Sequence, residues 1–114
     1  MNAKDKVITL FHQAAPFFIA LGDPNRQQIV VQLLKTHKLS VNHITNATSL
    51  SRPAISHHLK ILLQTGIIDV ERHGTQHFYY LADGSVKQVD LLESLVKALR
   101  ECIGWQERTS LKKA

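Results

Sequence analysis

Apolar residues recur every three or four positions along much of the chain, which is the spacing of helices with one buried face. The first such segment predicts a helix over residues 4–20, in which Pro16 should introduce a kink or loosen the last turn. Asp23 followed by Pro24 has the residue types of an N-cap and a first helical position. A second helix is therefore predicted from there to about residue 36, with an apolar face made of Ile29, Val30, Leu33 and Leu34.

Two short helices in tandem are predicted next. A very short strand is expected at residues 39–41, and apolar positions then mark a helix over residues 41–47. Ser51 has the residue type of an N-cap for a helix over residues 52–65, and Gly66 stands where a C′ glycine ends a helix. A tight pair of this kind is the helix-turn-helix pattern. The core face of the second helix is expected to hold Ile55, Leu59 and Leu62, joined partly by Ile61 and Leu63.

The hydrophobic period then changes from about 3.6 to about 2, which indicates strands. Residues 68–73 and 77–81 alternate around a glycine-containing loop and predict a β-hairpin. A last helix is expected from about residue 83 to 105, followed by a polar, frayed tail at residues 106–114. The fold class is therefore mainly α with a small β-hairpin wing: a winged helix-turn-helix in the order α-α-(short β)-α-α-β-β-α.

The composition narrows the class of protein. The 114 residues fit one domain, residues 1–114, and 44% apolar with 20% charged residues is typical of a globular chain. An excess of 14 Lys and Arg over 9 Asp and Glu permits nucleic-acid binding but does not by itself indicate it. Neither a signal peptide nor a run long enough to span a bilayer is visible, so we expect a cytoplasmic protein without membrane contact.

One side of the helix over residues 52–65 stays polar and basic. Arg52 lies in its first turn, where a recognition helix meets bases and where an arginine can bind guanine O6 and N7. Ser56 can bond to a base or a phosphate, and Lys60 is expected at a phosphate. Exposure to solvent also accounts for a polar helix face, without any contact with DNA. The ring of His58 can equally pack against the domain. The residues predicted to contact DNA are Arg52, Ser56, His57, His58 and Lys60 in this helix and Arg72, His73, Thr75 and Gln76 in the hairpin.

The last helix carries more apolar surface than one face on a small core requires. One apolar stripe holds Val89, Leu92, Val96, Leu99 and Ile103, and a second holds Leu91, Leu95, Ala98 and Cys102. We expect one stripe to cover the domain and the other to meet a twin subunit, with phenylalanines of the first helix contributing. The alternative is a helix sunk deeply in its own domain. The predicted dimer interface is Phe11, Phe18, Leu91, Leu95, Ala98, Leu99 and Cys102.

Two segments resemble the ArsR/SmtB-type winged helix-turn-helix repressors. LGDPNRQQIVVQLL resembles the second-helix signature of that family, and LSRPAISHHLKILLQTGIIDVERHGTQHFYYL resembles its recognition helix and wing. The family's Ser-x-His-Leu-Lys stretch stands at residues 56–60, and its closing Thr-Gly-Ile-Ile motif at residues 65–68. The resemblance covers about residues 21–81. It implies a homodimeric, DNA-binding transcriptional repressor that an inducer releases from its operator.

The patterns of the family's metal sensors are missing from this sequence. The region of the metalloid-binding cysteines reads LSVNHI, Ser85 stands where zinc sensors have histidine, and no histidine follows His77. We therefore expect no metal site and no cofactor, and the inducer stays unknown. The single Cys102 cannot form an intrachain disulfide. It is either a core residue or a thiol that reacts with an oxidant or pairs across a dimer.

The sequence favours a sequence-specific repressor that binds double-stranded DNA. Two recognition helices in successive major grooves would make its operator an imperfect palindrome. No enzyme is expected, because the chain has no glycine-rich phosphate loop, no HExxH and no recognisable nucleophile–base arrangement. The rival function is a winged-helix interaction module that binds a protein partner, or nucleic acid without sequence choice.

Overall fold

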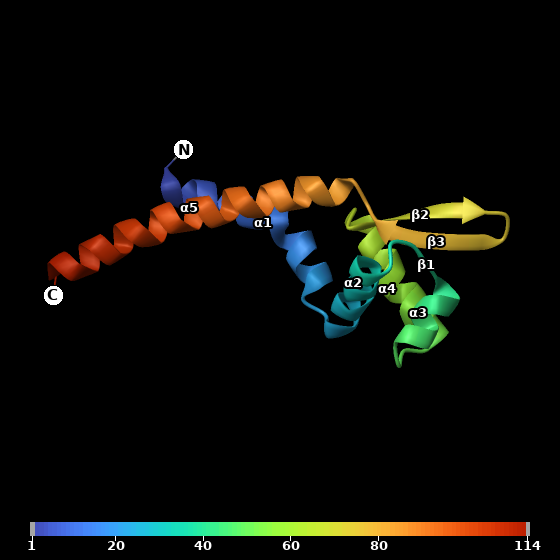
Figure 1. Ribbon diagram of the computed structural model, residues 1–114. Helices are drawn as coiled ribbons and strands as arrows, with labels where there is room; N and C mark the ends of the chain where they lie inside the picture. Colours follow the sequence, from blue (N-terminus) through green and yellow to red (C-terminus); the bar gives the residue numbers. More distant parts are fainter. Residues whose placement is uncertain (1, 114) are drawn as a thin grey trace. The chain divides into compact units, whose positions relative to one another are not determined.

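The helices and strands follow one another in the predicted order in a computed structural model of the chain. It describes the backbone of residues 2–113 and the side chains of residues 2–83 and 87–104. The elements are α1 (Ala3–Leu21), α2 (Pro24–Lys35), β1 (Leu39–Ser40), α3 (Val41–Ala47), α4 (Arg52–Gln64), β2 (Ile68–His73), β3 (Gln76–Leu81) and α5 (Gly84–Lys113) (Figure 1). The winged helix-turn-helix fold class is thereby confirmed.

The chain divides into two compact units. The winged unit is Pro16–Val86, and the helix-pair unit combines Met1–Ala15 with Lys87–Ala114. The boundary in α1 falls at Pro16, where the missing backbone N–H removes one helical hydrogen bond. The predicted kink at Pro16 and the single domain over residues 1–114 stay predictions.

Local side-chain caps explain where the helices of the winged unit begin. Asp23 Oδ1 accepts the backbone N–H groups of Asn25 and Arg26, at 2.8 and 3.1 Å, which confirms it as the N-cap of α2. Ser51 Oγ accepts the backbone N–H of Ala54 at 3.3 Å and caps α4 as predicted. These oxygens satisfy donors that the first turn of a helix leaves without partners. A cap that the sequence analysis did not find, Ser40, starts α3.

Gly66 ends α4 in the predicted way. Its φ of 76° lies in the left-handed region, which a glycine adopts without the steric cost of a Cβ. The backbone N–H of Ile67 then donates to the carbonyl of Leu62 at 3.1 Å, a closing bond typical of helix C-termini. The chain therefore turns directly from α4 into β2.

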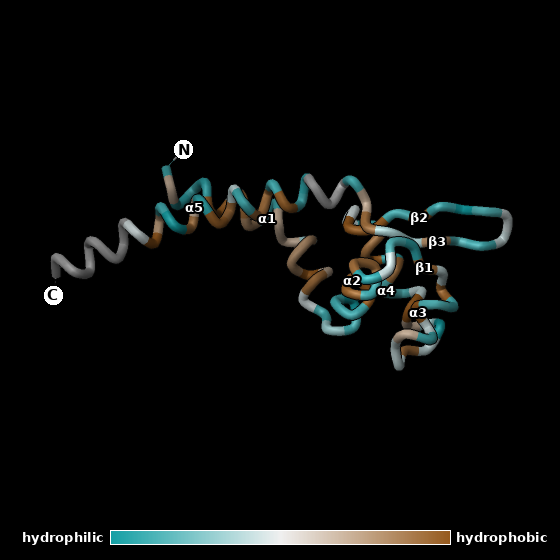
Figure 2. The backbone as a smooth tube through the Cα atoms, viewed as in Figure 1, coloured by the Kyte–Doolittle hydropathy of each residue, from teal (hydrophilic) through white to brown (hydrophobic). Residues whose placement is uncertain are grey.

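The sheet of the winged unit is antiparallel, in the order β1-β3-β2. Tyr79 of β3 lies opposite both Leu39 of β1 and Val70 of β2, so the short strand completes the sheet beside the hairpin. His73 pairs with Gln76, which leaves a two-residue turn whose first residue, Gly74, has a φ of 62°. The wing therefore projects as a tight hairpin, with a hydrophilic far end (Figure 2).

The core of the winged unit joins α2, α3, α4 and the sheet. Ile55, Leu59 and Leu62 are buried, as the spacing along α4 predicts. Burial of a side chain of this size contributes about 1.5–3 kcal/mol. Leu34, which the apolar pattern places on the core face of α2, is 68% exposed, so that prediction is wrong. The buried cluster is Ala20, Ile29, Leu33, Leu39, Ile44, Ile55, Leu59, Leu62, Ile67, Ile68 and Tyr79.

The helix-pair unit has its own small core between α1 and α5. Val7, Ala14, Leu95 and Ala98 are buried there, and the two alanines leave room for the helices to approach closely. Leu10, Leu91, Leu99 and Cys102 are partly buried around this cluster. The backbone of α5 is helical as far as Lys113, so the predicted frayed tail is wrong up to that residue; Ala114 lies outside the described residues. No helix in the described part of the chain is long and apolar enough to cross a membrane.

Candidate nucleic-acid interface

The exposed side of α4 lies opposite the residues that anchor it. Arg52, Ser56 and Lys60 follow one another at intervals of four residues and are exposed, and His57 is exposed beside them. The opposite side of the helix is buried in the core of the winged unit. Four of the five residues predicted on this helix thus share a solvent-facing polar side, which is the geometry that an element entering a groove requires.

Arg52 is held by a residue that the sequence analysis missed. Its Nη2 donates to Oδ1 of Asn42, which lies in the first turn of α3. The two residues are ten apart in sequence, so no local pattern joins them. Because the contact depends on how α3 packs on α4, only the fold could reveal it. Asn42 leaves Nε and Nη1 of the guanidinium available for another acceptor.

A hollow of about 200 Å³ joins the start of α4 to the wing. It brings Arg52 together with Thr75 and Gln76, three of the predicted contact residues that lie far apart in sequence. The polar side chains around it carry no carboxylate, so they can receive a phosphate or a base edge without charge repulsion. Its lining is Ser40, Val41, Asn42, Arg52, Thr75, Gln76 and His77.

The wing carries its predicted residues on the surface, with one acidic neighbour. Arg72, His73, Thr75 and Gln76 are all exposed. Glu71 accepts a hydrogen bond from Lys38 Nζ and lies 3.0 Å from His73 Nε2. The hydrogen bond from Lys38, with that from His73, holds the pKa of the Glu71 carboxyl below its usual value. The ring of His73 is thus engaged within the wing, while Arg72 has no such partner described.

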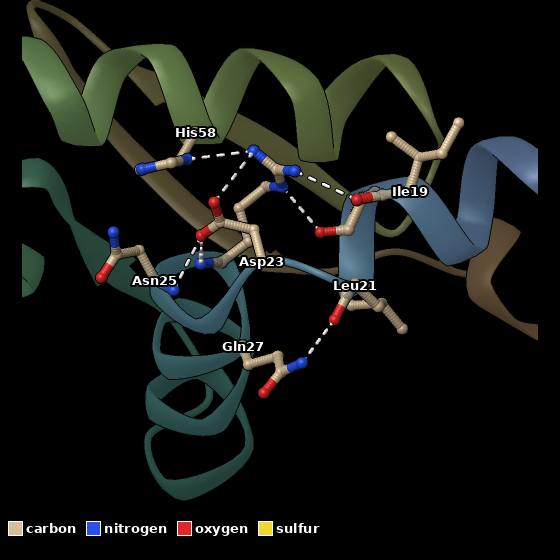
Figure 3. Close-up of polar contacts among 8 residues, drawn as sticks. Ile19, Leu21, Asp23, Asn25, Gln27 and His58 are labelled. Carbon is tan, nitrogen blue, oxygen red and sulfur yellow. Dashed lines mark hydrogen bonds and ion pairs between the residues drawn. The ribbon is translucent and has the colours of Figure 1, made fainter.

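His58, the fifth residue predicted on α4, is turned into the protein. Its side chain is buried, and Nδ1 lies 3.2 Å from Nη1 of Arg26 (Figure 3). The alternative that its ring packs against the domain agrees with this placement. We therefore leave His58 out of the proposed DNA contact.

Arg26 is the second residue that the sequence analysis missed. It is 9% exposed, and its Nε and Nη2 donate to the carbonyls of Ala20 and Ile19, at 2.6 and 3.0 Å. The spacing along the sequence indicates that Arg26 is buried, because it lies three and seven residues before buried Ile29 and Leu33, on the apolar face of α2.

Asp23 lies beside the guanidinium of Arg26, with its Oδ2 4.0 Å from Nη1. Its pKa is lowered, chiefly because the backbone N–H of Arg26 donates to the carboxylate, and also because Asn25 donates and the nearby guanidinium attracts it. Partial burial opposes this shift. The carboxylate is therefore charged in the folded protein at neutral pH and compensates part of the charge of Arg26.

The predicted interface residues divide into two groups in the structure. Leu95 and Ala98 are buried against the chain's own α1, so they are not free to meet a twin. Leu91, Leu99 and Cys102 are half-buried around them, and Phe11 and Phe18 are exposed. The other stripe of α5 is the one left open, with Val89, Val96 and Ile103 each about half exposed. Within the chain, α1 therefore covers the stripe that holds Leu95 and Ala98, and the dimer interface itself stays a prediction.

The described side chains contain no group of three His, Cys, Asp or Glu residues placed to hold a metal ion. Cys102 is a free, half-buried thiol. Ser85, which occupies the position of a zinc ligand in the resembled sensors, lies outside the described side chains.

Comparisons with known proteins agree with the geometry of α3, α4 and the wing. The model of the arsR family of bacterial regulatory proteins matches residues 23–70. An uncharacterised helix-turn-helix-type transcriptional regulator of Methanocaldococcus jannaschii is 38% identical over 79 residues, which cover 69% of this chain and 89% of that protein. The transcriptional repressor SdpR of Bacillus subtilis is 39% identical over 71 residues, 62% of this chain and 77% of the repressor.

A solved structure supports the fold alone. The ArsR-like transcriptional regulator from Rhodococcus sp. RHA1 superimposes with a TM-score of 0.69 at 24% identity, over 93% of this chain and 92% of that one.

Proposed function

The chain belongs to the ArsR family of bacterial regulatory proteins, and from this premise we propose that it represses transcription as a homodimer on a palindromic operator. It is a DNA-binding transcriptional regulator and not an enzyme. The protein acts in the cytoplasm, on double-stranded DNA. The observation that carries the proposal is the exposed row of Arg52, Ser56 and Lys60 on a helix whose opposite side is buried.

We propose a different contact with DNA for each residue in this row. Arg52, steadied by Asn42, reads a guanine in the major groove through its remaining donors. Ser56 and His57 reach bases or phosphates further along α4, and Lys60 neutralises a phosphate. The wing contributes Arg72, Thr75 and Gln76, together with His73, at the backbone or the adjacent minor groove.

The dimer forms through the exposed stripe of α5. Val89, Val96 and Ile103 recur every seven residues, with Leu92 and Leu99 between them, which is the a/d pattern of a two-helix seam. Burial of these side chains against the same stripe of a twin removes apolar surface from water on both subunits. Phe11 of α1 adds to the interface of the helix-pair unit, and the exposed Phe18 contributes from the winged unit.

We propose that the inducer is not a metal ion, because the ligand patterns of the family's metal sensors are missing from the sequence. Soft metals require thiolates or imidazoles in groups. Addition of zinc, copper or arsenite should therefore leave operator affinity unchanged. A stoichiometric metal site that lowers this affinity would contradict the proposal.

A binding measurement with the DNA upstream of the protein's own coding region tests the main proposal. The repressor should bind this duplex at least about a hundredfold more tightly than a scrambled duplex, at a fixed salt concentration. Equal binding to both duplexes, or none, would favour the rival function: a winged-helix module that binds a protein or nucleic acid without sequence choice.

A further inference from the structure

Arg26 holds three elements of the winged unit together from a buried position. Its guanidinium donates to the carbonyls of Ile19 and Ala20 in the last turn of α1, and it lies beside Asp23, the N-cap of α2. The remaining contact, from Nη1 to Nδ1 of His58, reaches α4 (Figure 3). A buried charge is costly unless it is paired and hydrogen-bonded, and these contacts meet that requirement.

The contact with α4 fixes the chemical state of His58. A guanidinium has donors only, so Nδ1 of the ring must accept the hydrogen bond. The ring is then neutral, with its hydrogen on Nε2. His58 directly follows His57, which belongs to the exposed side of α4. The bond therefore constrains both the rotation of α4 and its distance from the end of α1.

We propose that Arg26 is a positioning residue for DNA recognition, which holds α4 through the neutral ring of His58 and thereby sets how the exposed side of α4 meets the groove. The proposal rests on the proposed function, because it assumes that α4 is the recognition helix. It goes beyond that function because it makes operator binding depend on a buried residue that does not contact DNA.

A consequence is that two adjacent histidines contribute to DNA binding in different ways. Loss of the acceptor at Nδ1 of His58 would leave Nη1 of Arg26 without its contact with α4. The charged groups that face this ring are Arg26 and the carboxylate of Asp23 from α2, and the ring of His57 lies 5.6 Å away on α4 itself. The exposed His57 instead lies on the side of α4 that is proposed to face the phosphates.

The first test compares His58→Asn with His58→Leu, because the side-chain oxygen of asparagine can take the place of Nδ1 as an acceptor and leucine has no acceptor. His57→Leu, one position away on the exposed side, is the matched control. Operator affinity is measured on the folded variants at one pH and one ionic strength. His58→Asn should bind within about twofold of the native protein, whereas His58→Leu should bind about tenfold more weakly, a loss typical of one charged hydrogen bond.

In an Arg26→Lys background, His58→Leu should cost little further affinity, whereas His57→Leu should cost as much as it does in the native background. If His58→Leu binds as tightly as the native protein, or His58→Asn binds as weakly as His58→Leu, the proposal is wrong. The nitrogen-15 spectrum of the native ring gives an independent answer. A bare Nδ1 on His58 supports the proposal, and a proton on Nδ1 contradicts it.

The second test uses Arg26→Lys, which keeps the charge but cannot reach the carbonyls and His58 together. Operator affinity should fall about tenfold, a loss typical of one charged hydrogen bond, at a temperature where the variant is fully folded. A folded variant with native affinity would overturn the proposal; if Arg26→Lys does not fold, the His58 measurements decide. A native protein that does not select its operator would instead contradict the proposed function.

Discussion

At the scale of single residues, Arg52 and Lys60 are expected to contribute to DNA binding in different ways. Arg52→Ala should cost about 1–3 kcal/mol of operator binding and relax the choice of sequence, because a bidentate guanine contact is lost. Lys60→Ala should weaken binding to all duplexes alike and reduce the salt slope by about one, because a phosphate contact is lost. Fluorescence anisotropy on operator and scrambled duplexes, over a range of salt concentrations, checks both. Equal losses on both duplexes for Arg52→Ala would show that it contacts the backbone only.

Asp23 makes the stability of the winged unit depend on pH. Its pKa is lowered in the folded state, chiefly by the backbone N–H of Arg26, so the folded protein favours the charged carboxylate more than the unfolded chain does. The resulting stability is present above the unfolded pKa of the group and is lost as pH falls through the folded pKa. Asp23→Asn keeps a cap oxygen but cannot titrate, so its difference from the native protein in the free energy of unfolding should shrink towards acid. Urea unfolding at neutral and acid pH measures this difference, and a constant difference would contradict the assignment.

At the scale of elements, the pairing of α1 with α5 depends on one buried stripe. Leu95→Ala should lower the free energy of unfolding by about 2–5 kcal/mol, because it leaves a cavity beside Val7 and Ala14. Ser94→Ala, at the neighbouring exposed position, should change it by less than about 0.5 kcal/mol. Urea unfolding at a fixed protein concentration compares the two variants. Similar small effects would mean that Leu95 is not packed as described.

Element boundaries were largely predictable because local chemistry determines them. Asp23, Ser51 and Gly66 act on the backbone within a few residues of themselves, so their residue types predict where helices begin and end. The contact between Arg26 and His58 spans 32 residues and depends on how α2 and α4 pack. No local pattern specifies such a contact. The sequence therefore predicted which side of α4 is polar, but not which buried residues hold that side in place.

The two stripes of α5 show the same limit. Both are apolar and both have helical spacing, so periodicity alone could not decide which one α1 covers. The small side chains of Ala14 and Ala98 allow close packing on one stripe, and this preference is a property of the helix pair rather than of either helix. Exposure of Val96, at 48%, and burial of Leu95, at 2%, settle the choice within the chain.

At the scale of the whole molecule, the exposed stripe provides a test of the dimer that leaves the core intact. A charge at Leu95 would disrupt the packing of α1 on α5, so it could not separate an interface from a folding defect. Val96→Glu instead places a carboxylate on the exposed stripe, where a twin would have to bury it without a partner. Ser94→Glu adds the same charge at an exposed position outside the proposed seam and is the matched control.

Val96→Glu should sediment as a folded monomer, whereas Ser94→Glu should remain dimeric like the native protein. The same change should weaken operator binding, because a dimer engages two half-sites about 34 Å apart on one side of the duplex and a monomer engages only one. Hydroxyl-radical footprinting should accordingly show two protected half-sites for the native protein and for Ser94→Glu. If Val96→Glu remains a tight dimer, the interface does not lie on this stripe. If the native protein protects a single asymmetric site, the operator is not a palindrome. The proposed contacts of α4 with one half-site would still stand.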